Sequence, residues 1–155
     1  SSIANAGLML FALSDILNSN ILLFVAAYSF ATIPLVVINQ LANPTQDAIA
    51  NWEGIAWKNP LVGVALVIAL FSLAGIPPLA GFFGKFSLLL AAVPHLPYAA
   101  ILALVASVVG VFVYLRLLIL ALKKPTVQTK QSLSIEQSTV LLLTTLGSLS
   151  ALYFI

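Results

Sequence analysis

A lysine and a helix break lie next to each other in an otherwise apolar stretch of this sequence. The break is the run Gly75-Ile76-Pro77-Pro78-Leu79-Ala80-Gly81-Phe82-Phe83-Gly84, and Lys85 follows it directly. Inside a membrane, irregular backbone is tolerated only where protein or a water-filled cavity satisfies it, and an ionisable side chain is kept where it has a partner or a function. The pairing therefore indicates a transport site.

The predicted break depends on residue types that interrupt a helix. The two prolines have no N–H, so the carbonyls of Leu73 and Ala74, four residues earlier, lose their helical donors. Glycines on either side relieve the steric crowding. An ordinary turn between the two helices of a hairpin is the alternative interpretation. The residues assigned to the break are Gly75, Pro77, Pro78 and Gly81.

Lys85 is the predicted proton-relay residue. A second half-helix beginning near Leu79 would place this lysine in its first two turns, where the helix N-terminus and desolvation both oppose the charged ammonium. A lysine that can lose its proton beside unpaired carbonyls and water has what a proton relay needs. The alternative is that its side chain merely snorkels to the membrane interface.

The composition is that of an integral membrane protein. Hydrophobic residues make up 62% of the 155 residues and charged residues only 6%. Six basic residues against four acidic ones give no basic surface for nucleic acid, so a nucleic-acid partner is excluded. The absence of cysteine excludes disulfides, thiolate metal sites and cysteine nucleophiles.

The apolar segments predict an all-α, polytopic membrane helix bundle that forms a single transmembrane domain over residues 1–155. About five transmembrane helices are expected, one of them discontinuous, with a short interfacial helix capped by Thr45 in the polar connector between the second and third. Residues 123–137 are expected to form a solvated loop. The predicted spans cover residues 3–17, 21–41, 60–93, 98–122 and 138–155.

Loop lysines decide whether residues 60–93 cross the membrane once or twice. A single crossing places all the loop lysines on one side, which the positive-inside rule favours, whereas two crossings separate Lys58 from the others. As continuous helix the segment would reach roughly 51 Å at ~1.5 Å per residue, so part of it must be non-helical, tilted or protruding. The lysines concerned are Lys58, Lys123, Lys124 and Lys130.

Several hydroxyl groups lie within the predicted spans and are candidates for lining a water path. On membrane helices such hydroxyls more often bond to carbonyls of their own helix or bridge neighbouring helices, and this alternative stays open for each of them. The candidates are Tyr28, Thr32, Ser72, Ser107 and Tyr114.

The run from Leu73 to Phe86 resembles, nearly residue for residue, the signature of the chain 2 or subunit N family of the proton-pumping NADH:quinone oxidoreductase, complex I. Three flanking pieces occur in the expected order. Ser1-Ser2-Ile3-Ala4-Asn5-Ala6-Gly7 resembles the Ser-Ser-Ile-Ala-His-Ala-Gly opening of an earlier helix, Asn59-Pro60-Leu61 precedes the broken helix, and Tyr114-Leu115-Arg116 resembles a Tyr-Tyr-Leu-Arg helix end.

The resemblance implies the C-terminal half of an antiporter-like fold, with Lys85 at the position of the family's lysine on the second discontinuous helix. That lysine is taken to pass protons to the far side of the membrane. Asn5 stands where the family usually has His or Gln, so only a hydrogen-bonding role on the water path is expected for it. Ile33-Pro34-Leu35 replaces the usual Gly-Ala-Phe.

The first half of the family fold is absent from these 155 residues. The chain is expected to be either a fragment of a longer subunit or one product of a split gene, and the sequence leaves both open. In either case we expect a polypeptide segment supplying the N-terminal half, and other complex I membrane subunits, as partners in the bilayer.

Three functions are carried forward from the sequence. The first is a proton-translocating segment of complex I. The second is a subunit of a multi-subunit cation/proton antiporter, and the third is a non-pumping structural or assembly subunit of complex I. The chain is expected to carry no redox catalysis, metal or cofactor, since redox cofactors are expected in other subunits, and to lie in a mitochondrial inner or bacterial cytoplasmic membrane.

Overall fold

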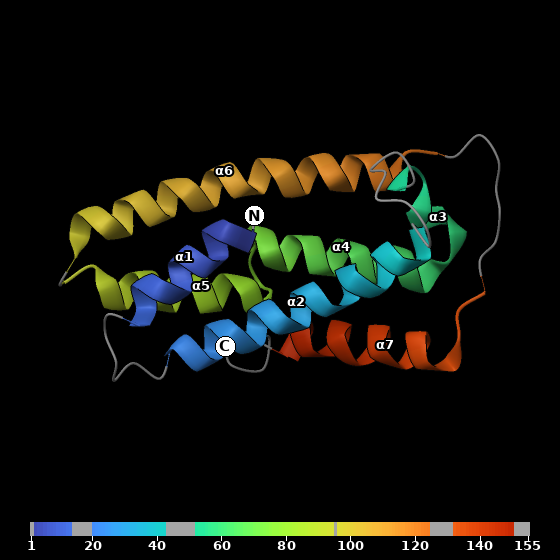
Figure 1. Cartoon of the computed structure of the whole chain (residues 1–155), viewed down its shortest axis with the longest axis horizontal. Helices are drawn as coiled ribbons and strands as arrows, with labels where there is room; N and C mark the ends of the chain where they lie inside the picture. The colour runs from blue at the N-terminus through green and yellow to red at the C-terminus, as the bar shows by residue number, and fades with distance from the viewer. Residues whose placement is uncertain (1, 14–19, 43–51, 95, 125–131, 151–155) are drawn as a thin grey trace.

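Seven helices make up the part of the chain that is described by the computed structural model, which covers residues 2–13, 20–42, 52–94, 96–124 and 132–150. These residues include no strand, so the all-α prediction is confirmed for them (Figure 1). Among them, α2 and α6 are long and apolar enough to cross a membrane. The helices are α1 (Ser2–Leu13), α2 (Asn20–Ala42), α3 (Ile55–Lys58), α4 (Pro60–Ala74), α5 (Ala80–Ala92), α6 (Pro97–Leu122) and α7 (Ile135–Leu149).

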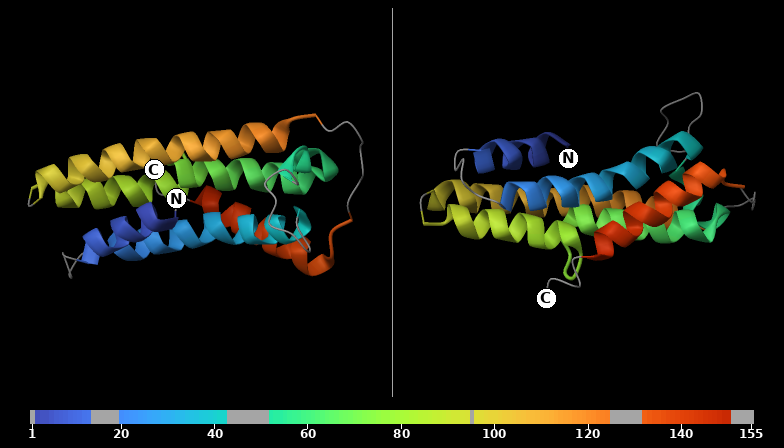
Figure 2. Two further views of the ribbon diagram at one scale, coloured as in Figure 1. Left: turned by 45° about the horizontal axis from the view of Figure 1, so that its top comes forward. Right: turned by 90° about the horizontal axis from the view of Figure 1, so that it is seen from below.

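The helices α4 and α5 follow each other end to end in one direction, and α2 and α6 run beside the pair in the opposite direction (Figures 1 and 2). With 15 and 13 residues, α4 and α5 are each too short to span a hydrocarbon core of ~30 Å. Together they extend along the length of α6. The helix α7 lies along the α4 half of the bundle, and α1 lies along the other half (Figure 2).

The core forms where α2, α4 and α7 meet. Ile38, Leu66, Leu70 and Leu141 are each at most 1% exposed there. Small residues on the facing helices, including the buried Ala31 of α2 and the buried alanines of α4, let the backbones approach closely, as is typical of helix packing in membranes. In contrast, most side chains of α6 are exposed, which leaves a broad apolar face on that helix.

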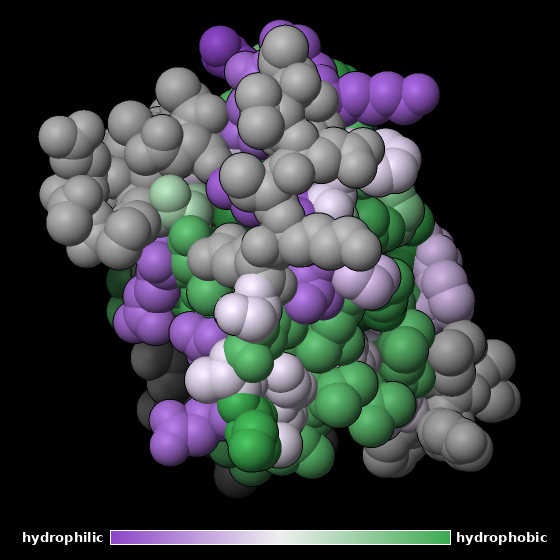
Figure 3. Space-filling view, turned by 90° about the vertical axis from the view of Figure 1, so that its right-hand side faces the viewer, coloured by the Kyte–Doolittle hydropathy of each residue, from purple (hydrophilic) through white to green (hydrophobic). Residues whose placement is uncertain are grey.

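Contacts at one end of the bundle hold the start of α4 next to the end of α6. Lys123 Nζ lies 2.8 Å from Glu53 Oε1, and the indole Nε1 of Trp57 donates to the carbonyl of Leu122 at 2.8 Å. Lys58, the last residue of α3, therefore lies at the same end as Lys123, which is the arrangement expected if residues 60–93 cross once. This end faces the viewer in Figure 3, where hydrophilic residues lie toward the top and left beside a hydrophobic area at the lower right.

The last helix begins earlier than expected. The solvated loop was expected to reach residue 137, but α7 starts at Ile135 because Ser134 and Gln137 form a capping box. Ser134 Oγ accepts the backbone N–H of Gln137 at 3.2 Å, and Gln137 Oε1 accepts the N–H of Ser134 at 3.0 Å. Of the predicted interfacial helix, the described residues contain α3, whereas its predicted cap, Thr45, lies outside them. The loop lysine Lys130 and the span ends at residues 14–17 and 151–155 also lie outside the described residues.

Removing the Ser134 cap is expected to destabilise the protein modestly. A Ser134→Ala change leaves the Gln137 N–H without its acceptor, and a lost N-cap costs about 1 kcal/mol. Thermal unfolding in detergent should show a lower midpoint than wild type, while Ser132→Ala, just outside the cap, should not. Equal midpoints for the two variants would show that the cap contributes nothing measurable.

Candidate functional site

The interruption between α4 and α5 begins with a Schellman motif. Gly75 adopts the left-handed conformation with φ 78° and ψ 44°, which glycine accepts without steric cost. Its N–H donates to the carbonyl of Ser72 at 3.0 Å, and the N–H of Ile76 donates to the carbonyl of Phe71 at 3.0 Å. The peptide bond between the two prolines that follow is cis, and α5 starts at Ala80.

A side chain of α4 caps the start of α5. The N-cap residue of α5, Leu79, has no side-chain acceptor, and Ser72 Oγ instead accepts the N–H of Gly81 at 3.1 Å. The Ser72 side chain is fully buried. A Cβ on Gly81 would overlap the Ser72 carbonyl, so glycine is needed for this close approach. The break is thus a packed joint between two half-helices.

Lys85, on α5, is hydrogen-bonded to the end of α4. Its Nζ donates to the carbonyl oxygen of Leu73, one of the two carbonyls that the prolines were expected to leave without a helical donor. The lysine side chain also runs against Gly75, where an added Cβ would lie 3.4 Å from Lys85 Cδ. A half-buried ammonium on α5 thereby satisfies backbone of α4.

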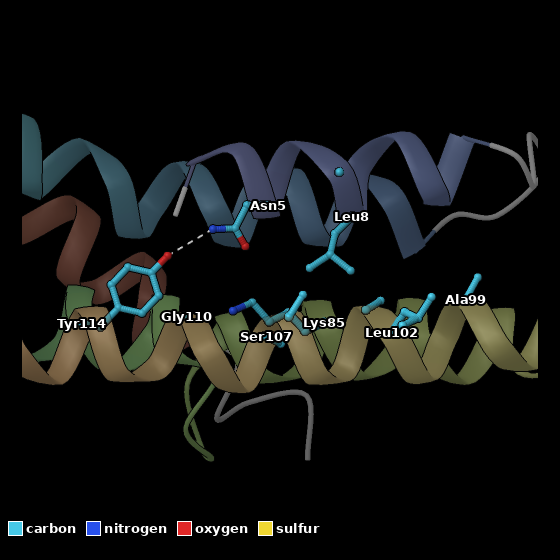
Figure 4. A pocket seen from close by; sticks show the side chains of 11 residues that line it. Asn5, Leu8, Lys85, Ala99, Leu102, Ser107, Gly110 and Tyr114 are labelled. Atoms are coloured by element: carbon cyan, nitrogen blue, oxygen red, sulfur yellow. Dashed lines mark hydrogen bonds between the residues drawn. The ribbon is translucent and has the colours of Figure 1, made fainter.

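A cavity of about 320 Å³ opens beside Lys85, between α1, α5 and α6. Asn5, Ser107 and Tyr114 provide its other polar side chains, and Leu8 and Leu102 are among the apolar ones (Figure 4). Asn5 Nδ2 donates to the hydroxyl of Tyr114 at 3.2 Å, and both residues are buried. Polar groups and a lysine around a space of this size can hold several water molecules.

Lys85 also lines two other cavities. One, of about 200 Å³, lies between the end of α4, α5 and α6 and shares Ser107 with the first cavity. The other, of about 10 Å³, lies toward α2 and is lined by Tyr28, Ser72 and Gly81 among others. A cavity of the last size has room for about one water molecule. Lys85 is therefore the residue at which the three spaces meet.

A family model matches most of this sequence. The family model described as "NADH:quinone oxidoreductase/Mrp antiporter, TM" matches residues 1–110, more than half of the chain. The chain belongs to this family. Together with the apolar helices α2 and α6, membership of a transmembrane family makes it a membrane protein.

Relatives of the chain within this family are named as subunits of quinone oxidoreductases. The chain is 39% identical over 120 residues to NADH-quinone oxidoreductase subunit N of Pelobacter propionicus, a match that covers 74% of the chain and 26% of that protein. The chain is 38% identical over 131 residues to NAD(P)H-quinone oxidoreductase subunit 2 of Gloeobacter violaceus, a match that covers 80% of the chain and 25% of that protein. The chain spans about a quarter of the length of the curated relatives it matches.

The residues that the sequence predicted to line a water path fall into three groups, according to the cavity that each one lines. Of the three cavities at Lys85, Asn5 and Tyr114 line the one of about 320 Å³, and Tyr28 and Ser72 line the one of about 10 Å³. Thr32 lines none of these cavities, and its hydroxyl donates to the carbonyl of Tyr28 at 2.9 Å on the same helix. Their roles in proton movement stay predictions.

Sequence reasoning missed two features of this region. Gly110 lines the cavity of about 320 Å³ between Ser107 and Tyr114. The spacing of these residues along α6 puts them on one helix face, a signal that was available in the sequence. Ser148 of α7 is fully buried, and its hydroxyl has no hydrogen-bond partner among the described residues. No pattern in the sequence marks that burial.

Proposed function

We propose that the chain is the proton-translocating C-terminal part of a membrane subunit of NADH:quinone oxidoreductase, complex I, and that Lys85 is its relay residue. The observation that carries the proposal is the place of Lys85, on a broken helix, bonded to the Leu73 carbonyl, and bordering three cavities. The names of the relatives support the choice of complex.

The proposed relay uses both protonation states of one amine. With its proton, Lys85 donates to the Leu73 carbonyl, and this contact stabilises the charge at a site away from bulk water. After losing the proton, the nitrogen lone pair can accept another from water in the cavity beside Asn5 and Tyr114. Ser107 borders that cavity and the one beyond it, so its hydroxyl can both accept and donate along the way.

The proposed topology has about five crossings within one domain, with α4 and α5 forming one discontinuous crossing. Support comes from the end-to-end arrangement of these two short helices and from the shared end of Lys58 and Lys123. The positive-inside rule then assigns the lysine-bearing end to the cytoplasm or mitochondrial matrix.

The rest of the machinery belongs, in this proposal, to other polypeptide segments. The partners are other complex I membrane subunits and a segment that supplies the N-terminal half of the fold, in an energy-transducing bacterial or mitochondrial membrane. Redox cofactors are assigned to other subunits, which makes the chain part of a translocase without redox chemistry of its own.

The family description also includes Mrp antiporters, so the complex in which the chain resides is the first test. We expect an affinity-tagged chain to copurify with a peripheral arm that oxidises NADH and reduces a quinone. Recovery of an assembly that exchanges cations for protons and has no NADH oxidation would contradict the complex I assignment and favour the antiporter.

A further inference from the structure

An apolar groove lies at the lysine-bearing end of the bundle, separate from the cavities around Lys85. Its volume is about 470 Å³, and it is formed by α3, α4 and the last residue of α6. One face of α4 provides most of the surface, since residues three, four and seven apart share a helix face. The residues used here are Trp57, Pro60, Gly63, Val64, Val67 and Leu122.

The groove is open and follows α4. From Pro60 to Ile68 it follows the helix for roughly 12 Å at ~1.5 Å per residue. Val64 is 55% exposed within it. At Gly63 an added Cβ would lie 2.7 Å from the carbonyl oxygen of Ala56, so α3 packs directly against α4 at the floor. This shape suits an extended hydrocarbon chain.

An interfacial aromatic residue lines the groove, and lysines adjoin its lining residues in the sequence. Trp57 is half-exposed and is fixed by its hydrogen bond to the Leu122 carbonyl, and tryptophan is typical of the membrane–water interface. Lys58 follows Trp57, and two lysines follow Leu122. Glu53 pairs with Lys123, and within the described residues Lys58 and Lys124 are the further cations that adjoin groove residues in the sequence.

We propose that this groove binds an anionic phospholipid, with one acyl chain along α4 and the phosphate beside Lys58 and Lys124. A groove with an apolar wall in a bilayer accepts any acyl chain, so the positive charge of the adjoining lysines determines which headgroup is preferred. Attraction of an anionic lipid surface to one lysine corresponds to roughly a fivefold change in binding. The proposed positive-inside orientation places this end at the leaflet that carries anionic lipids.

Photocrosslinking of the assembled complex tests the proposal. Val64 is replaced by p-benzoylphenylalanine, and the complex is reconstituted in phosphatidylcholine with a minor fraction of phosphatidylglycerol and irradiated. Mass spectrometry of the Val64 peptide then gives the ratio of the two lipid adducts. We expect phosphatidylglycerol to be enriched several-fold over its bulk fraction. A probe at Trp57 gives a second position in the same groove if the first variant assembles poorly.

Matched variants separate charge recognition from general lipid contact. The double change Lys58→Gln with Lys124→Gln should return the adduct ratio to the bulk ratio, whereas Arg116→Gln, outside the groove, should leave the enrichment intact. A probe at the exposed Ile119 of α6 should report the bulk ratio. A bulk ratio at Val64, or adducts to another polypeptide in place of lipid, would overturn the proposal.

Discussion

Replacing Lys85 by methionine is expected to lower proton translocation by about tenfold or more in complexes that still assemble. Methionine keeps the length of the side chain and removes its titratable amine, and a positioned proton-transfer group typically contributes roughly a hundredfold or more. Assembly should fall less, because the main structural loss is the hydrogen bond to Leu73, whose unpaired carbonyl costs about 1–3 kcal/mol. Translocation in proteoliposomes, divided by the amount of assembled complex, measures the difference.

Arg116→Met is the matched control for the lysine variant. It removes a cation from an exposed position of α6 that lines none of the three cavities at Lys85, so translocation should match wild type. Normal pumping by an assembled Lys85→Met complex would eliminate the relay and favour the structural or assembly function.

Gly81→Ala is expected to prevent the close packing of the start of α5 against the end of α4. We expect the amount of folded protein to fall sharply. The added Cβ would overlap the Ser72 carbonyl, and backbone cannot move aside as the end of a flexible side chain can. Overpacking of this kind costs about 1–3 kcal/mol and occasionally more, and the hydrogen bond from Gly81 to Ser72 would be lost as well. Thermal stability and the yield of assembled complex are the measurements.

Gly7→Ala provides the comparison for that loss. Beyond its own helix, no heavy atom of the described residues lies within 4 Å of a Cβ added to Gly7, and alanine is favoured over glycine within a helix by about 0.5–1 kcal/mol. The Gly7 variant should therefore be at least as stable as wild type. A Gly81→Ala protein that is as stable as the Gly7→Ala protein would mean that the joint tolerates a wider separation than the structure has.

The broken helix could be predicted because its causes are local. Prolines remove N–H groups at known positions, and a glycine can take the left-handed conformation that ends α4, so residue types alone located the interruption. The same reasoning identified Leu73 and Ala74 as carbonyls without helical donors. It did not identify which of them Lys85 would contact, because that depends on the rotation and distance of α5 relative to α4.

Contacts between distant segments were beyond sequence reasoning for a physical reason. Asn5 and Tyr114 are 109 positions apart, and whether their side chains meet depends on how α1 and α6 are rotated about their axes. The spacing of Ser107, Gly110 and Tyr114 marks one face of α6, but nothing in the sequence shows which helix packs against that face. The start of α7 was different, because the Ser134 to Gln137 capping pattern was present and was overlooked.

The hydrogen bond between Lys85 and Leu73 links the separation of α4 and α5 to the protonation of the Lys85 amine. Its donor belongs to α5 and its acceptor to α4, so moving the two half-helices apart by about 1 Å would take the atoms beyond the usual hydrogen-bond distance of ~2.7–3.2 Å. Conversely, loss of the proton weakens the contact, because charge-assisted hydrogen bonds are roughly twice as strong as neutral ones. The hydrogen bond therefore couples the separation of the two half-helices to the protonation of Lys85, and by reciprocity each affects the other by the same free energy.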